Sequence, residues 1–153
     1  MRVRVIAFLA LAALACSVAS EGPSNSESEA LVVAEEKRYR IVAHAVSPVS
    51  DHSPGELRVK MVASGGWHLE PEAPIRLDFE PSDVRLEPTS FANEDAHVLN
   101  DDGFEFVAQL HADASGDRYA KGKIKFGICE GPKEQCVIVR RDIEISLQII
   151  FAD

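Results

Sequence analysis

Apolar residues recur at every second position through most of this chain, and this period constrains the fold more than any other feature. The clearest run is 143–151, where Ile, Leu and Phe alternate with Glu, Ser and Gln. Such alternation places apolar side chains on one face of an extended strand and polar side chains on the other. No window carries a convincing helical period. Further runs of the same kind lie at 39–45, 57–63, 75–79, 84–86, 104–110 and 124–128.

Short turn-forming sequences separate these runs. They combine Gly, Pro, Ser and Asp, the residues that tight turns need, and they lie at 53–55, 64–66, 80–83, 101–103, 114–117 and 130–133. Strands with one apolar face each require a second sheet to cover that face. The sequence therefore predicts an all-β fold, an antiparallel immunoglobulin-like β-sandwich of about seven or eight strands over residues 37–153.

Residues 1–15 have the pattern of a secretory signal peptide. Arg2 and Arg4 precede eleven residues without a polar side chain. As a helix this run would reach about 16 Å, roughly half of a ~30 Å hydrocarbon core, so it is too short to span a membrane. The sequence Ala13-Leu14-Ala15-Cys16 resembles the lipobox of bacterial lipoproteins, with Ala and Leu in swapped order. The resemblance implies acylation of Cys16, and the alternative is ordinary cleavage after Ala15 or Ala19.

Residues 16–36 are expected to form a flexible tether behind the lipidated Cys16. The composition from Ser17 to Ala30 is dominated by Ser, Glu, Gly, Pro and Asn, which leaves too little apolar area to offset the entropy of ordering the backbone. Either cleavage route places the protein outside the cytoplasm. Ser17 in place of Asp resembles lipoproteins that are sent to the outer membrane. We therefore expect a domain anchored by its lipid on the periplasmic side of a bacterial membrane.

The net charge of −9 excludes one class of partner, because an acidic surface repels phosphate backbones and nucleic acid is therefore not expected. The sequence contains no Gly-x-Ser-x-Gly elbow and no phosphate-binding glycine loop, so nothing indicates a hydrolase. No cofactor is expected either. The histidines do not have the close spacing that is typical of metal ligands, and no metal site is predicted from them; they are His44, His52, His68, His97 and His111.

Cys129 and Cys136 remain as an even pair once Cys16 is acylated or removed with the signal. In an oxidising compartment such a pair is expected to form a disulfide. The bond would close an eight-residue loop between the last two strands, which stabilises a fold by about 2.5 kcal/mol in the chain-entropy model. Energy alone does not decide whether this disulfide is a structural staple or a reactive group.

Side-chain alternation adds an expectation about Cys129. If the outward direction of Lys121, Lys123 and Lys125 continues along the strand, Cys129 also faces solvent, where its sulfur can be attacked. These lysines, together with two arginines across the hairpin, are expected to favour the thiolate. The arginines are Arg140 and Arg141, and Glu130 and Glu134 partly cancel their field.

A family resemblance lies in the last third of the chain. The sequence Lys123-Ile-Lys-Phe-Gly-Ile-Cys129, followed by Cys136 and a terminal strand, resembles the amino-terminal periplasmic domain of the bacterial thiol:disulfide interchange protein that relays electrons across the inner membrane. Gly66-Trp67-His68-Leu69 strengthens the likeness. The resemblance implies an immunoglobulin-like fold, and it implies that Cys129 and Cys136 exchange electrons with a periplasmic or membrane thiol protein.

Trp67 and His68 are weaker candidates for a binding role. They follow Gly65-Gly66 and could line a groove if they are exposed, although a lone Trp in a sandwich more often lies in the core. Three hypotheses for the function follow. The protein is a lipid-anchored binding or structural module with an inert disulfide, a thiol–disulfide exchange module, or a metal-handling lipoprotein that uses the scattered histidines.

Overall fold

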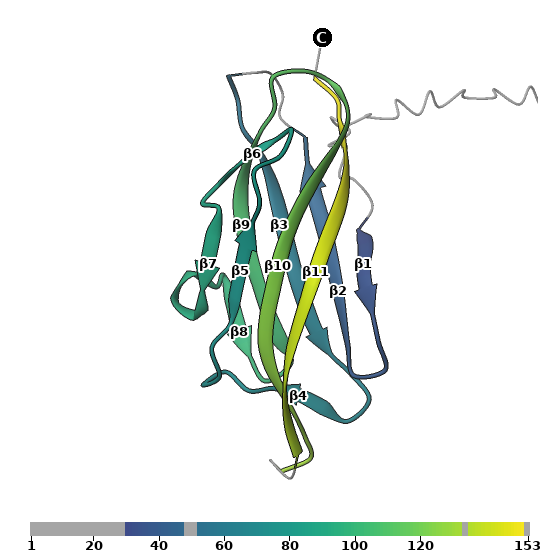
Figure 1. Ribbon diagram of the computed structural model, residues 1–153, viewed down its shortest axis with the longest axis vertical. Helices are drawn as coiled ribbons and strands as arrows, with labels where there is room; N and C mark the ends of the chain where they lie inside the picture. The colour runs from purple at the N-terminus through teal and green to yellow at the C-terminus, as the bar shows by residue number, and fades with distance from the viewer. Residues whose placement is uncertain (1–29, 48–51, 133–134, 152–153) are drawn as a thin grey trace, which may run out of the picture.

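Two antiparallel sheets pack face to face in the computed structural model of this chain, which describes residues 30–47, 52–132 and 135–151 (Figure 1). The first sheet has the order β1-β2-β3-β9-β6, with β8 also paired to β9. Its strands are β1 (Leu31–Glu35), β2 (Tyr39–Val46), β3 (Gly55–Ala63), β6 (Arg85–Glu87), β8 (Val98–Asn100) and β9 (Gly103–His111).

The second sheet has the order β11-β10-β5-β7, with β4 also paired to β10. Its strands are β4 (Trp67–Leu69), β5 (Arg76–Phe79), β7 (Ser90–Ala92), β10 (Gly116–Glu130) and β11 (Gln135–Ile149). One short 3₁₀ turn, η1 (Asn93–Asp95), follows β7. Within the described ranges no helix has the length and the hydropathy needed to cross a membrane.

The prediction of an immunoglobulin-like sandwich is confirmed. Seven strands in chain order, β2, β3, β5, β6, β9, β10 and β11, form the sheets β2-β3-β9-β6 and β5-β10-β11. This is the arrangement of the immunoglobulin fold, in which strands one, two, five and four face strands three, six and seven. The structure adds β1, β4, β7 and β8 to this core, which gives eleven strands in the described residues.

The additional strands lie where the alternating pattern gives little information. Three of them have only three residues each, too few to show a period. The fourth, β1, pairs with β2 and lies within residues 16–36. Part of the expected tether is therefore folded. The apolar run Leu31-Val-Val-Ala34 adds a strand to the edge of the first sheet beside β2.

Aromatic side chains join the two sheets at the centre of the sandwich. Phe126 of β10 lies 5.1 Å from Tyr39 of β2 and 5.7 Å from Phe104 of β9, measured between ring centroids. Phe106 of β9 lies 5.0 Å from Phe91 of β7. Each buried ring stabilises the fold by about 1.5–3 kcal/mol through its removal from water. This core fixes β10 against the first sheet and so positions the end of the hairpin that β10 forms with β11.

The β10–β11 hairpin is the longest feature of the molecule. Each strand has 15 residues, and the pairing is continuous from Gly116↔Ile149 to Glu130↔Gln135. The hairpin runs the full height of the view in Figure 1 and ends beyond β4, which pairs with β10 near that end. Both cysteines of the second sheet lie in this terminal part.

Candidate functional site

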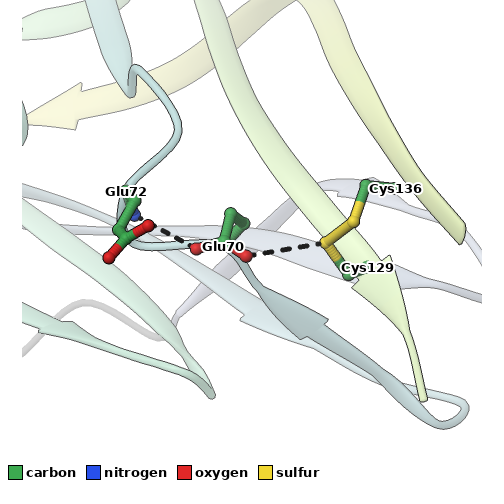
Figure 2. Close-up of a disulfide and its surroundings, with 4 residues drawn as sticks. All are labelled: Glu70, Glu72, Cys129 and Cys136. Carbon is green, nitrogen blue, oxygen red and sulfur yellow. Dashed lines mark hydrogen bonds between the residues drawn. A yellow bond between two sulfur atoms is a disulfide. The ribbon is translucent and has the colours of Figure 1, made fainter. Parts of the chain in front are cut away.

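A disulfide joins Cys129 of β10 to Cys136 of β11, as the cysteine count predicted. The S–S distance is 2.08 Å and the two Cα atoms are 4.0 Å apart. The cysteines are directly opposite each other in the ladder, so the bond closes the end of the hairpin between strands that are already paired (Figure 2).

The two sulfur-bearing residues differ sharply in exposure. Cys129 has a relative exposure of 0%, whereas Cys136 is exposed. The prediction that Cys129 faces solvent is therefore wrong. Its side chain does point to the outer face of the sheet, opposite in direction to Ile128, but another part of the chain covers that face. Of the two cysteines, Cys136 is the one that is exposed to solvent.

Residues 70–73 form this cover, which we call the covering segment. They leave β4 and cross the outer face of β10, where the Glu70 N–H donates a 2.9 Å hydrogen bond to the Gly127 carbonyl. Gly127 permits the close approach, because a Cβ at this position would lie 2.6 Å from the Cβ of Ala73. A side chain on residue 127 would therefore separate the segment from the strand.

Asn93 of η1 holds the covering segment from the other side. Its side-chain N–H₂ donates hydrogen bonds of 3.0 Å to the carbonyls of Pro71 and Ala73. Its Oδ1 accepts a 2.7 Å bond from the Ile75 N–H. One side chain thus satisfies three backbone groups that a loop on a sheet face would otherwise expose. The cover over Cys129 is a fixed part of the fold.

A carboxylate lies against the buried sulfur. Glu70 Oε2 is 3.8 Å from Cys129 Sγ (Figure 2), and Oε1 of the same side chain accepts a bond from the Glu72 N–H at 3.4 Å. In the disulfide form Cys129 has no S–H to donate, so the first contact is a carboxylate against a sulfur atom. In the reduced protein the Cys129 thiol can donate a hydrogen bond to this oxygen. A negative sulfur at this position is disfavoured by the neighbouring charge.

The electrostatic setting differs from the one that the lysine alternation predicted. Lys125 is four residues from Cys129 along β10, about 13 Å at 3.3 Å per residue. Two further lysines are engaged elsewhere, Lys121 with Glu144 at 3.2 Å and Lys123 with Glu80 at 3.9 Å. The charged group nearest to the buried sulfur along these contacts is the Glu70 carboxylate, at 3.8 Å.

Trp67 and His68 lie beside the disulfide, on β4. Trp67 is opposite Glu130 of β10 and His68 is opposite Cys129, so His68, Cys129 and Cys136 occupy one row across three strands. Trp67 is half-buried against the edge of the core, with Arg38 Cζ 5.3 Å from its ring centroid. His68 is half-buried and borders a groove of about 360 Å³ formed with Glu70, Pro71, Glu72 and Asp101.

Sequence reasoning found the disulfide and its two neighbours on β4 but missed the group that most affects the sulfur. Glu70 directly follows the Trp67-His68-Leu69 segment, and the register of β4 against β10 alone brings it to Cys129. No local pattern indicates that pairing. The available signal was Gly127 itself. A glycine within a strand of alternating residues indicates that another segment of the backbone approaches closely at that position.

Two further predictions concern other residues. Cys16, with the signal peptide and the proposed lipid, lies outside the described residues. Within the described part of the chain, His, Cys, Asp and Glu side chains form no group of three or more that could hold a metal ion. A scan against models of known protein families gives no match, and a search of curated proteins gives none either.

Proposed function

We propose that this chain is an exported module, anchored to a bacterial membrane by a lipid on Cys16, that exchanges electrons with a partner thiol protein through the Cys129–Cys136 disulfide. The observation that carries the proposal is the asymmetry of the pair. Cys136 is exposed at the hairpin end, while Cys129 is fully buried against the Glu70 carboxylate. An external thiolate therefore meets one defined sulfur.

The exchange begins with attack by a partner thiolate on Cys136 Sγ. A bond forms between the two sulfurs, the Cys129–Cys136 bond breaks, and Cys129 leaves with the electron pair. Cys129 takes up a proton, because a thiolate beside Glu70 is disfavoured. A second thiol of the partner, as its thiolate, then attacks the partner half of the mixed disulfide and releases Cys136, which is also protonated. Two electrons and two protons have moved from the partner dithiol to this pair.

The same steps run in reverse when the partner is the acceptor. Cys136 attacks the partner disulfide, and Cys129 must then lose its proton to attack Cys136 and release the partner. The Glu70 carboxylate, 3.8 Å from the sulfur, is placed to accept that proton. Glu70 thus has two effects, since it favours the thiol at rest and offers a base when the mixed disulfide is resolved.

Sequence features support the remaining parts of the proposal. The run before Cys16 has the length and composition of an export signal, and Cys16 follows a lipobox-like sequence. The Gly66-Trp67-His68-Leu69 segment and the cysteine pair resemble the interchange-protein domain. In the structure this segment and the pair are neighbours on β4, β10 and β11, which supports reading them as one site.

A non-catalytic binding or structural module, with the disulfide as an inert staple, is the second candidate. The complete burial of Cys129 favours it. So does the negative charge beside the sulfur, which makes Cys129 a poor leaving group unless it is protonated. The two candidates therefore differ in how easily the bond is reduced.

The reduction potential of the pair decides between them. The mature protein is equilibrated in glutathione and dithiothreitol redox buffers, quenched with acid, alkylated and weighed by mass spectrometry. We expect a reduction potential of about −200 mV, which lies in the range of thiol–disulfide exchange proteins. A value below about −300 mV would identify a staple and overturn the proposal. The Glu70→Gln variant serves as an internal probe, because removal of the neighbouring charge makes Cys129 a better leaving group and should speed reduction of the bond by dithiothreitol.

A further inference from the structure

A row of three cations crosses the outer face of the second sheet. Arg140 of β11 is opposite Lys125 of β10, and Lys125 is opposite Arg76 of β5. Residues that are directly opposite in an antiparallel ladder share a face, and like charges in that position destabilise a sheet. We call these three residues the cation row. A sheet that keeps such a row has a cost in stability that binding of an anionic group would remove.

Two of the three cations are available for such a group. Arg76 forms an ion pair with Asp78 at 2.9 Å. Across residues 30–47, 52–132 and 135–151, no ion pair engages Lys125 or Arg140. This contrasts with the neighbouring positions on the same strands, where Lys121 and Lys123 each have a carboxylate partner.

The cation row lies in a groove of about 260 Å³. Besides the row, its lining includes Lys123 and Arg141 against only two acidic residues, Asp78 and Asp142. One of these carboxylates is already bound by Arg76. The local excess of positive charge stands out on a chain whose net charge is −9, and it gives this face a potential opposite to that of the whole molecule.

The groove is close to the sulfur that faces solvent. Arg140 and Cys136 lie on the same side of β11, four residues or about 13 Å apart. Ile138 lies between them on that side and is 45% exposed. A protein that contacts the cation row can therefore cover Ile138 and reach Cys136 with the same surface.

We propose that this face, consisting of the cation row and Ile138, docks an acidic segment of the thiol protein that exchanges with Cys136. The inference rests on the proposed function for the identity of the partner, and on charge complementarity for its chemistry. Docking orients the partner toward Cys136 and raises the rate of encounter. The disulfide alone offers a partner only the exposed Cys136 and no charged contact surface.

A protein segment fits this face better than an anionic membrane does. The face also carries acids beside its cations, because Asp142 and Glu144 follow Arg140 at every second position of β11 and Asp78 lies opposite Lys123. A uniform negative surface would be repelled by these carboxylates, whereas a polypeptide can place its acids opposite the cations only. The net charge of the chain also opposes approach to anionic lipid.

Binding can be tested with a probe that cannot undergo exchange. A fluorescein-labelled peptide of ten glutamates, without cysteine, is titrated with the mature protein and followed by fluorescence anisotropy, and a peptide of ten glutamines is the reference. We expect saturable binding of the acidic peptide only, and we expect it to weaken as salt rises from about 50 mM to about 500 mM. The double variant Lys125→Gln/Arg140→Gln should lower the affinity about tenfold or more.

A matched control removes the same charge elsewhere. The double variant Lys60→Gln/Arg85→Gln changes β3 and β6 of the first sheet and should change the affinity less than about twofold. Absence of peptide binding, or equal loss in both double variants, would overturn the inference. So would tighter, row-dependent binding to phosphatidylglycerol vesicles than to the peptide, which would assign the face to a membrane.

The outcome is separable from that of the proposed function. Reaction of the reduced protein with oxidised glutathione, a small disulfide that does not need the docking face, reports exchange by the Cys129–Cys136 pair without docking. Loss of peptide binding in the Lys125→Gln/Arg140→Gln variant with unchanged glutathione reaction supports docking. A reduction potential below about −300 mV together with intact peptide binding would reject exchange and leave the cation row as a site that binds anionic segments.

Discussion

At the scale of single residues, the difference between the two sulfurs leads to a test with single cysteines. In the Cys129→Ser variant only Cys136 is free at this site, and in Cys136→Ser only Cys129 is free. Because Cys136 is exposed and Cys129 is 0% exposed beside a carboxylate, the first should form a mixed disulfide with oxidised glutathione about tenfold faster or more. Intact-mass measurements over time give both rates. Equal rates, or faster reaction at Cys129, would show that the covering segment does not protect the sulfur.

Tyr39 connects the core to the hairpin through one polar atom. Its ring packs edge-on to Phe126 at 5.1 Å, and its Oη accepts a 2.8 Å hydrogen bond from Arg141 Nε. Arg141 also pairs with Glu36. Burial raises the pKa of Tyr39 above its ordinary value of 10.0, and the positive charge of Arg38 opposes this shift in part.

The Tyr39→Phe variant should separate the contribution of the Tyr39 hydroxyl from that of its packed ring. At neutral pH we expect a loss of about 1 kcal/mol in the free energy of unfolding, since the ring stays packed and one hydrogen bond is lost. The neutral phenol is the form that the folded state favours, so its contribution is complete below pH 10.0 and is lost as pH rises through the higher folded-state pKa.

Urea unfolding at several pH values measures this effect. The gap between the wild type and Tyr39→Phe should narrow above pH 10.0. The control is Tyr119→Phe, because Tyr119 is 46% exposed and its replacement should leave the stability at neutral pH unchanged. A gap that stays constant with pH would contradict the assigned role of burial.

At the scale of strands, the sequence was sufficient to predict an element when the strand is long and has one apolar face and one polar face. The alternation of Ile143 with Glu144 and onward predicts the carboxyl-terminal half of β11, because one face is buried from Ile143 to Ile149. It was insufficient where a face is covered by a distant segment. Parity correctly points Cys129 outward, yet Glu70 lies 59 positions away in the sequence. Solvent exposure depends on that tertiary contact, which local alternation does not encode.

The contact between β10 and the covering segment can be broken and restored. In Gly127→Ala the new methyl would meet Ala73 Cβ at 2.6 Å, which should destabilise the fold by about 1–3 kcal/mol. The Glu70 amide, whose hydrogen bond to the Gly127 carbonyl is 2.9 Å, should exchange its hydrogen faster. Denaturant unfolding and amide hydrogen exchange check the two effects.

Removal of the opposing methyl is the matched control for that change. The double variant Gly127→Ala/Ala73→Gly takes away the atom that the new Cβ meets, so it should recover most of the lost stability and the slow exchange at Glu70. If Gly127→Ala alone leaves both measurements unchanged, residues 70–73 do not lie as close to β10 as described. If the double variant shows no recovery, the cost arises elsewhere on the strand.

For the whole molecule, the disulfide lies apart from the aromatic core that stabilises the fold. The aromatic core lies between the sheets at Tyr39, Phe104 and Phe126, while the sulfurs lie at the hairpin end on the outer face. The backbone ladder pairs the two cysteines directly and continues along the whole hairpin. The bond therefore constrains only a short loop, and the sandwich should not depend on it.

The variant Cys129→Ala/Cys136→Ala should accordingly stay folded. We expect the same circular dichroism spectrum as the wild type and a loss of at most about 2.5 kcal/mol, the chain-entropy value for an eight-residue loop. Urea unfolding of the oxidised wild type, the reduced wild type and the variant measures the difference, with Gln135→Ala as a control for disturbance of the hairpin end. An unfolded variant would make the bond a structural requirement, because a disulfide whose reduction unfolds its own domain is unsuited to repeated exchange. A folded variant with a small loss leaves the two sulfurs free to change oxidation state while β10 and β11 stay paired, as the proposed exchange needs.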